Sequence, residues 1–220
     1  MKMKILKVTI IIGMPLLVIA LFLAGPAIKG KLLFSAFILL AVFERAWEGL
    51  CTSRDKDSDK IEGDWTLPIS ALSYIILVIL CLAEFYSVPR IPNLIIASMG
   101  LCVYVSSIAL RLWSINSLGD QWSIHIIGAD KLNGQRRLVC KGPYRYIRHP
   151  VYLGIILEQI SIPLAANLYY TAIIAACFAI PFQIIKARLE EGEMEKRLGA
   201  VYKEYISKTP RFNIFNMRHA

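Results

Sequence analysis

Residues 67–87 read LPISALSYIILVILCLAEFYS, and Glu84 is the only charged residue among them. A helix needs about 20 apolar residues to cross a bilayer core of about 30 Å. This stretch is therefore long and apolar enough to be a membrane span. The whole chain has 220 residues, of which 56% are hydrophobic, and several other stretches have the same character. The sequence predicts an integral membrane protein.

Further apolar segments predict an all-α fold, a polytopic transmembrane helix bundle of about five to six spans. They cover about 5–25, 32–50, 93–115, 151–165 and 168–186. We interpret the first as an uncleaved span, because it is long for a signal peptide. Only Ala166 and Asn167 separate the last two, which predicts a tight C-terminal helical hairpin with Pro163 and Asn167 marking the turn. We expect two regions, N-terminal spans over 1–115 and a catalytic region with a cytoplasmic cofactor pocket over 116–220.

The net charge of +9 is concentrated, with Lys and Arg gathered in residues 131–148 and 186–218. Next to apolar spans, such clusters mark cytoplasmic loops that contact anionic lipid headgroups, so both termini are predicted to be cytoplasmic. No nucleic-acid-binding motif accompanies them, so membrane lipids are the expected partners, with no obligate protein partner evident. The cysteines and histidines lack metal-ligand spacing, and no GxGxxG or Walker A sequence is present. Metal catalysis and a Rossmann or P-loop site are not expected.

The densest polar motif is LVCKGPYRYIRHPVYLG at 138–154. Pro150 suits the first position of a helix, whose unpaired N–H groups favour an anion. Arg145, Arg148 and His149 add charge and hydrogen-bond donors, and the tyrosines add flat surfaces for an aromatic base. The motif predicts a polar ligand held at the membrane face. The alternative is an ordinary basic and aromatic belt at the membrane interface.

Three other polar features lie near the predicted spans. Arg111 falls in the last turns of the fourth span, where it is either functional or a snorkelling interfacial side chain. Glu158 lies about two turns into the fifth span, where an ionisable residue is costly and suggests function, unless it is shallow. Residues 186–205, KARLEEGEMEKRLGAVYKEY, predict an amphipathic helix that continues the sixth span into water.

Together these motifs resemble the isoprenylcysteine carboxyl methyltransferase family and the wider set of integral-membrane methyltransferases, over roughly 110–215. The resemblance implies S-adenosylmethionine as methyl donor, held between the Arg-His-Pro loop, the following helix and the Glu-Glu helix. Arg188 and Glu191 would lie nearer the acceptor, and either Lys186 or Arg188 would orient an acceptor carboxylate. The residues that the resemblance assigns to the cofactor are Arg136 (usually a His in the family), Leu138, Val139, Tyr144, His149, Tyr152 and Glu190.

The expected function is methyl transfer to a lipophilic acceptor that enters from the bilayer, an isoprenylcysteine-type carboxylate. Such a carboxylate needs no general base. A phospholipid amine acceptor would need one, and Glu158 and Glu191 are the candidates. A small thiol is a third possible acceptor. A sterol-type membrane reductase that uses NADPH, and a non-enzymatic membrane protein, are the rival functions.

Overall fold

The computed structural model describes residues 9–26, 28–48, 65–119 and 138–212. Every regular element in these ranges is a helix, which confirms the predicted all-α class for them, and each predicted apolar segment overlaps a helix. In chain order the elements are η1 (Thr9–Gly13), α2 (Met14–Ala24), α3 (Lys31–Trp47), α4 (Thr66–Ser87), α5 (Leu94–Leu118), η5 (Gly142–Arg145), α7 (Pro150–Ala165), α8 (Tyr169–Leu198) and α9 (Ala200–Lys208).

Three of these helices, α4, α5 and α8, are long and apolar enough to cross a membrane by length and composition. Two shorter apolar helices, Ile11–Ala24 and Pro150–Ala165, accompany them. Large apolar side chains cover the outside of the bundle, with Leu33 77% and Ile95 73% exposed. An exterior of this kind suits lipid tails better than water. The structure therefore supports an integral membrane bundle.

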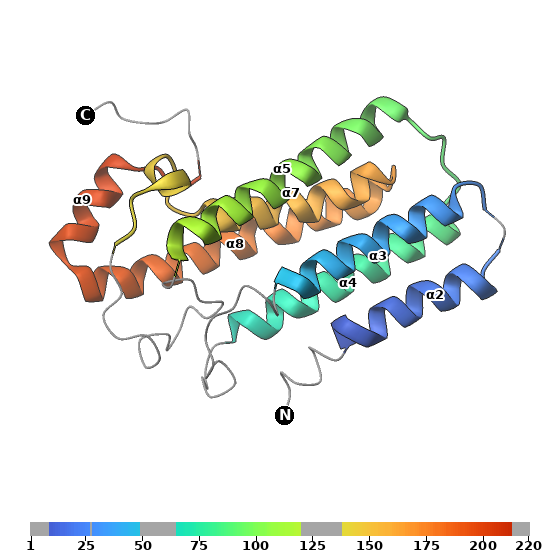
Figure 1. Ribbon diagram of the computed structural model, residues 1–220, viewed down its shortest axis with the longest axis horizontal. Coiled ribbons are helices and arrows are strands. Elements are labelled where there is room, and N and C mark those ends of the chain that lie inside the picture. The colour runs from blue at the N-terminus through green and yellow to red at the C-terminus, as the bar shows by residue number, and fades with distance from the viewer. Residues whose placement is uncertain (1–8, 27, 49–64, 120–137, 213–220) are drawn as a thin grey trace.

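The helices form two neighbouring groups (Figure 1). In one group α3 lies beside α4, with α2 next to them, and in the other α5 runs alongside α7 and α8. The apolar core lies mostly among α2, α3 and α4 and extends to the second group, and it includes the fully buried Val18, Ile38, Val78 and Ile162. The loop before α7 and the short helix α9 lie together at one end of the molecule.

Glycines let α5 and α7 approach closely along their length. A Cβ atom at Gly100 would lie 2.5 Å from the backbone nitrogen of Ala165, and one at Gly154 would lie 2.4 Å from Cγ of Arg111. Real Cβ atoms do not come this close to other atoms. The two helices are antiparallel, since the start of α5 meets the end of α7. Gly154 thereby makes room for the side chain of Arg111 against α7.

The predicted α7–α8 hairpin is confirmed, with a turn at 166–168. Asn167 adopts a positive φ of 58°, and its Oδ1 accepts hydrogen bonds from the backbone N–H of Asn93 and from the hydroxyl of Tyr169, both at 3.0 Å. Pro163 lies inside α7, close to its end, and its carbonyl accepts from the N–H of Leu168. Asparagine tolerates this left-handed conformation better than most residues.

A carboxylate from α4 caps the beginning of α8. Glu84 Oε2 accepts from the backbone N–H and the hydroxyl of Thr171, at 2.7 and 2.6 Å, and its Oε1 accepts from the N–H of Tyr170 at 3.3 Å. A helix N-terminus has unpaired N–H groups and a partial positive charge, so a carboxylate stabilises it.

The helix predicted over 186–205 is wrong as a single element. Helix α8 runs without a break from the apolar span to Leu198, and the chain then turns at Gly199, whose φ is 53°. Helix α9 begins at Ala200. Glycine adopts this backbone conformation without steric cost, so it ends α8 and redirects the chain. The turn brings Tyr202 and Tyr205 of α9 into buried positions.

Candidate functional site

His149 lies at the junction between the Arg-His-Pro loop and α7. It is the N-cap residue of α7, and Pro150 occupies the first helical position, as predicted. The C-terminal segment 209–212 lies against this loop. The backbone N–H of Arg148 donates to the carbonyl of Pro210 at 2.9 Å, and that of His149 donates to the carbonyl of Arg211 at 3.3 Å.

Charged side chains from three parts of the chain meet around Glu191. Its Oε1 lies 2.9 Å from Nε2 of His149 and 3.5 Å from Nη2 of Arg148. The guanidinium of Arg211 binds the same carboxylate through Nε at 3.0 Å and Nη2 at 2.5 Å. Glu190 Oε2 lies 3.4 Å from Nδ1 of His149. We call Arg148, His149, Glu190, Glu191 and Arg211 the His149 cluster.

Both ring nitrogens of His149 therefore face a carboxylate. Burial by itself would lower the pKa of the imidazole, but hydrogen bonds to Glu190 and Glu191 and their negative charge outweigh burial, so the pKa is raised above its ordinary value. A protonated imidazole donates from both nitrogens, which is what this geometry needs. The cluster thus favours the cationic form of His149.

Aromatic side chains surround the His149 cluster. The ring of Tyr152 stacks on the imidazole of His149, with centroids 5.3 Å apart. Burial, and then the negative charge of Glu190, raises the pKa of the Tyr144 hydroxyl well above its ordinary value. The hydroxyl of Tyr205 donates to the carbonyl of Tyr144 at 2.6 Å and ties α9 to the loop. Leu138 and Val139, also predicted here, are half-buried.

The two candidates for orienting an acceptor carboxylate differ in position. Lys186 is buried, its Nζ donates to the hydroxyl of Ser70 at 3.2 Å, and it lies 5.1 Å from the ring centroid of Tyr152. Arg188 is exposed. Residues two apart in a helix do not share a face. The role of Arg188 at the acceptor stays a prediction, and of the two residues Lys186 is the one that contacts Tyr152.

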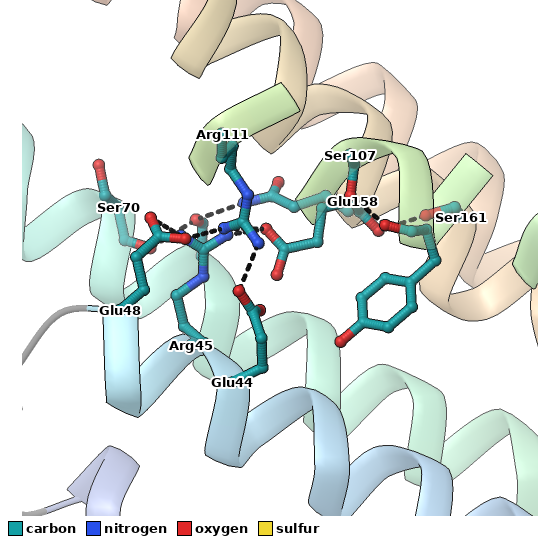
Figure 2. A network of polar contacts seen from close by, with 11 residues as sticks. Glu44, Arg45, Glu48, Ser70, Ser107, Arg111, Glu158 and Ser161 are labelled. Carbon is teal, nitrogen blue, oxygen red and sulfur yellow. Dashed lines mark hydrogen bonds and ion pairs between the residues drawn. The ribbon is translucent and has the colours of Figure 1, made fainter. Parts of the chain in front are cut away.

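A second group of charges is buried deeper between the helices (Figure 2). The guanidinium of Arg111 lies 2.7 Å from Glu44 Oε1, 2.8 Å from Glu48 Oε2 and 3.0 Å from Glu158 Oε2. Arg45 pairs with Glu158 and, at 3.3 Å, with Glu48. These five residues, which we call the buried ion network, join the end of α3 to α5 and α7.

The network corrects one sequence interpretation. The snorkelling alternative for Arg111 is wrong, because its side chain has no exposed surface and contacts three carboxylates. Glu158 is fully buried and contacts two guanidinium groups. A carboxylate engaged by two guanidinium groups is poorly placed to take up a substrate proton, so the geometry does not suit Glu158 as a general base.

Lys186 connects the two groups of charges. Its partner Ser70 lies beside Glu48 of the buried ion network (Figure 2), and its neighbour Tyr152 stacks on His149. Through these contacts the His149 cluster and the buried ion network are neighbours in one polar region.

Comparison with known families gives a match over much of this region. Residues 99–196 match the model of the isoprenylcysteine carboxyl methyltransferase (ICMT) family. This part of the chain is therefore similar to the ICMT family. The match includes α7 with most of α5 and α8, and so it contains Arg111, His149, Lys186 and Glu191.

One curated relative also matches. It is the uncharacterized protein YpbQ of Bacillus subtilis (strain 168), which is 29% identical over 99 residues. The alignment covers 44% of this chain and 56% of that relative. The chain thus spans little more than half the length of the relative.

The ICMT region does not hold the whole site. Glu44, Arg45 and Glu48 of the network precede it, and Arg211 of the His149 cluster follows it. Sequence analysis assigned none of these four residues to the site. Three charged residues within five positions at the end of an apolar run were the available signal. Arg136, predicted as a cofactor contact, lies outside the described residues.

Proposed function

We propose that this protein is an integral-membrane methyltransferase that moves a methyl group from S-adenosylmethionine to the carboxylate of an isoprenylcysteine-type acceptor. The match of residues 99–196 to the ICMT family model supports the proposal, and so does the length and apolar composition of α4, α5 and α8, which suit membrane spans. The polar region built around His149 supports it further.

The residues around His149 fit the donor chemically. When bound, S-adenosylmethionine would supply a sulfonium methyl group for in-line displacement. The carboxylate of Glu190 suits the donor's ammonium group, and the tyrosine rings offer flat surfaces to its adenine. In this proposal the donor is held by Tyr144, His149, Tyr152 and Glu190, with Leu138 and Val139 as apolar neighbours.

One observation carries the choice of acceptor: both candidate general bases are engaged in ion pairs. Glu158 pairs with Arg111 and Arg45, and Glu191 pairs with Arg211 and His149. An amine acceptor must lose a proton before it reacts, whereas a carboxylate is already nucleophilic. The geometry thus favours a carboxylate over a phospholipid amine.

Lys186 is the residue that we propose orients the acceptor carboxylate. In the reaction the bond between sulfur and methyl carbon breaks, and a bond between carboxylate oxygen and methyl carbon forms. The charges of the sulfonium and the carboxylate disappear together, and no proton is transferred. The protein's tasks are to align the reacting groups and to exclude water. A buried ammonium at Lys186 serves the first task.

The proposal also covers the route by which the acceptor reaches the site and the side of the membrane on which the site lies. In this proposal a lipophilic acceptor enters the site from the bilayer, and membrane lipids are further partners. The distribution of Lys and Arg favours a cytoplasmic position for both termini and for the His149 cluster.

The test is methyl transfer by the purified protein in detergent with S-adenosylmethionine labelled in the methyl group. N-acetyl-S-farnesylcysteine, phosphatidylethanolamine and a small alkyl thiol are the alternative acceptors. A carboxyl methyl ester releases labelled methanol in base, whereas N-methyl and S-methyl products do not. We expect base-labile label on the farnesylcysteine. Label on the amine or thiol instead would overturn the choice of acceptor, and label on none of them would contradict the proposed function.

A further inference from the structure

Arg148 is a buried cation whose hydrogen-bonding capacity is largely unused. Its side chain is 10% exposed, and its closest charged contact is the 3.5 Å distance from Nη2 to Glu191. Its Nε and Nη1 are buried and have no hydrogen-bond partner among the described residues. Leaving buried donors of a charged group unpaired costs stability, so native proteins rarely do it without a ligand, ion or water.

The surrounding charges favour an anion as the missing partner. Arg148, Arg211 and a protonated His149 are three cationic groups, and within the His149 cluster they face two carboxylates, Glu190 and Glu191. Like charges that share a partly buried site repel each other unless an opposite charge joins them. One additional carboxylate would balance the cluster.

The C-terminal segment 209–212 encloses this site. Its backbone accepts hydrogen bonds from Arg148 and His149, and the ring of Phe212 lies 6.0 Å from the imidazole of His149. The segment also brings Arg211 to Glu191, with 31% of the arginine side chain still exposed. Arg211 can therefore reach both Glu191 and a ligand beside it.

We propose that Arg148 and Arg211 form a carboxylate-binding subsite for the amino-acid part of the methyl donor, enclosed by residues 209–212. This inference rests on the proposed function. Planar guanidinium groups bind a carboxylate through paired hydrogen bonds, which a lysine cannot reproduce. Glu190, whose side chain is 32% exposed, then faces the donor's ammonium group. Segment 209–212 is part of the donor site although it lies beyond the ICMT match.

The test compares two ligands that differ only at this end. S-Adenosylhomocysteine carries the amino-acid part, and 5′-methylthioadenosine has the same nucleoside and sulfur without it. Both would be titrated calorimetrically into the full-length protein in detergent, as wild type and as Arg148→Met, Arg148→Lys and Arg211→Met. Arg145→Met is the matched control, because Arg145 is an exposed arginine in the same loop and outside the cluster.

We expect Arg148→Met and Arg211→Met each to weaken S-adenosylhomocysteine binding by roughly ten- to a hundredfold, the effect of losing hydrogen bonds to a charged group. Binding of 5′-methylthioadenosine should change less than threefold, which also shows that each variant is folded. Arg148→Lys should recover part of the loss, and Arg145→Met should match wild type for both ligands.

Equal weakening of both ligands by the Arg148 and Arg211 variants would overturn the subsite, as would no weakening of either. In both cases wild-type binding of S-adenosylhomocysteine would leave the proposed function standing. Wild-type protein that is folded and binds neither ligand would contradict the proposed function and the subsite together.

Discussion

Arg111 of α5 and Glu158 of α7 lie 3.0 Å apart, from Nη1 to Oε2, and neither side chain has any exposed surface. Arg45 of α3 holds the same carboxylate from a second direction. Three helices that are distant in sequence therefore share one buried carboxylate. The network holds three carboxylates and two guanidinium groups, so both arginines keep a carboxylate partner when Glu158 is replaced.

Glu158→Gln should destabilise the protein by about 1.5–3 kcal/mol, because Arg111 and Arg45 lose charge-assisted hydrogen bonds but keep their other carboxylate partners. The measurement is the thermal unfolding temperature in detergent. Glu204→Gln is the control, because Glu204 forms an exposed pair with Lys208 on α9 that should contribute little. Unfolding of Glu158→Gln at the wild-type temperature would contradict the network's stabilising role.

Gly154→Ala should disrupt the same network by a steric route. The new Cβ would lie 2.4 Å from Cγ of Arg111, so either the arginine or α7 must move. We expect a lower unfolding temperature and a loss of about 1–3 kcal/mol, as for other overpacked sites.

Gly192→Ala on α8 is its matched control. No atom lies within 4 Å of the added Cβ there, and alanine favours helix more than glycine does. This variant should be as stable as wild type or slightly more stable. Equal destabilisation by both substitutions would show that close packing at Gly154 is not the cause.

Glu84 should stabilise the beginning of α8, next to the hairpin turn, because its carboxylate caps that helix. Glu84→Ala removes the acceptor for the backbone N–H groups of Tyr170 and Thr171 and for the hydroxyl of Thr171. The expected loss is about 1–2 kcal/mol, the usual range for a helix N-cap. Faster hydrogen exchange of the amides of 170–172, with unchanged exchange around His149, would locate the effect. Unchanged exchange at 170–172 would contradict it.

The helices and the hairpin were predictable because their signals are local. Apolar runs predicted the first and last residues of α4, α5, α7 and α8 to within a few positions, except for the end of α8. Asn167 marked the turn. The break at Gly199 was missed, although its glycine was a visible signal. A charged amphipathic pattern on both sides of Gly199 favoured one continuous helix, and tertiary contacts of Tyr202 and Tyr205 favour the bend.

The site was predictable only in part. Family resemblance placed Tyr144, His149, Tyr152 and Glu190 in one region, and the structure brings them together. The pairing of Arg111 with Glu44 spans 67 residues, and no local pattern encodes it. Arg211 sits in a basic tail, so its charge was attributed to the membrane surface. Its contact with Glu191 depends on the path of residues 209–212 across the loop.

The raised pKa of His149 predicts a specific pH dependence of stability. Because the folded state binds the proton more tightly than the unfolded chain, the cationic form stabilises the fold. That contribution is fully present below about 6.5, the ordinary pKa of histidine, and is lost as pH rises through the higher folded pKa. The unfolding temperature of wild type minus that of His149→Gln should therefore fall between pH 6 and pH 9. A difference that stays constant over this range would contradict the ion pairs at His149.

Lys186 and Arg188 should differ in their effect on methyl transfer. Lys186→Met should raise the KM for the carboxylate acceptor at least tenfold, because a buried ammonium near Tyr152 is lost. Arg188→Met removes an exposed cation from the same helix and should change KM less than twofold. Steady-state kinetics with the farnesylcysteine acceptor would separate them, and the reverse order would show that Arg188 orients the acceptor.

The central claim is that the His149 cluster binds the methyl donor, and calorimetric titration with S-adenosylhomocysteine tests it most directly. Wild type should bind with micromolar affinity, His149→Ala and Glu190→Ala should abolish binding while remaining folded, and the exposed Glu204→Ala should bind like wild type. Folded wild-type protein that does not bind S-adenosylhomocysteine, or folded His149→Ala and Glu190→Ala variants that bind it normally, would contradict the claim.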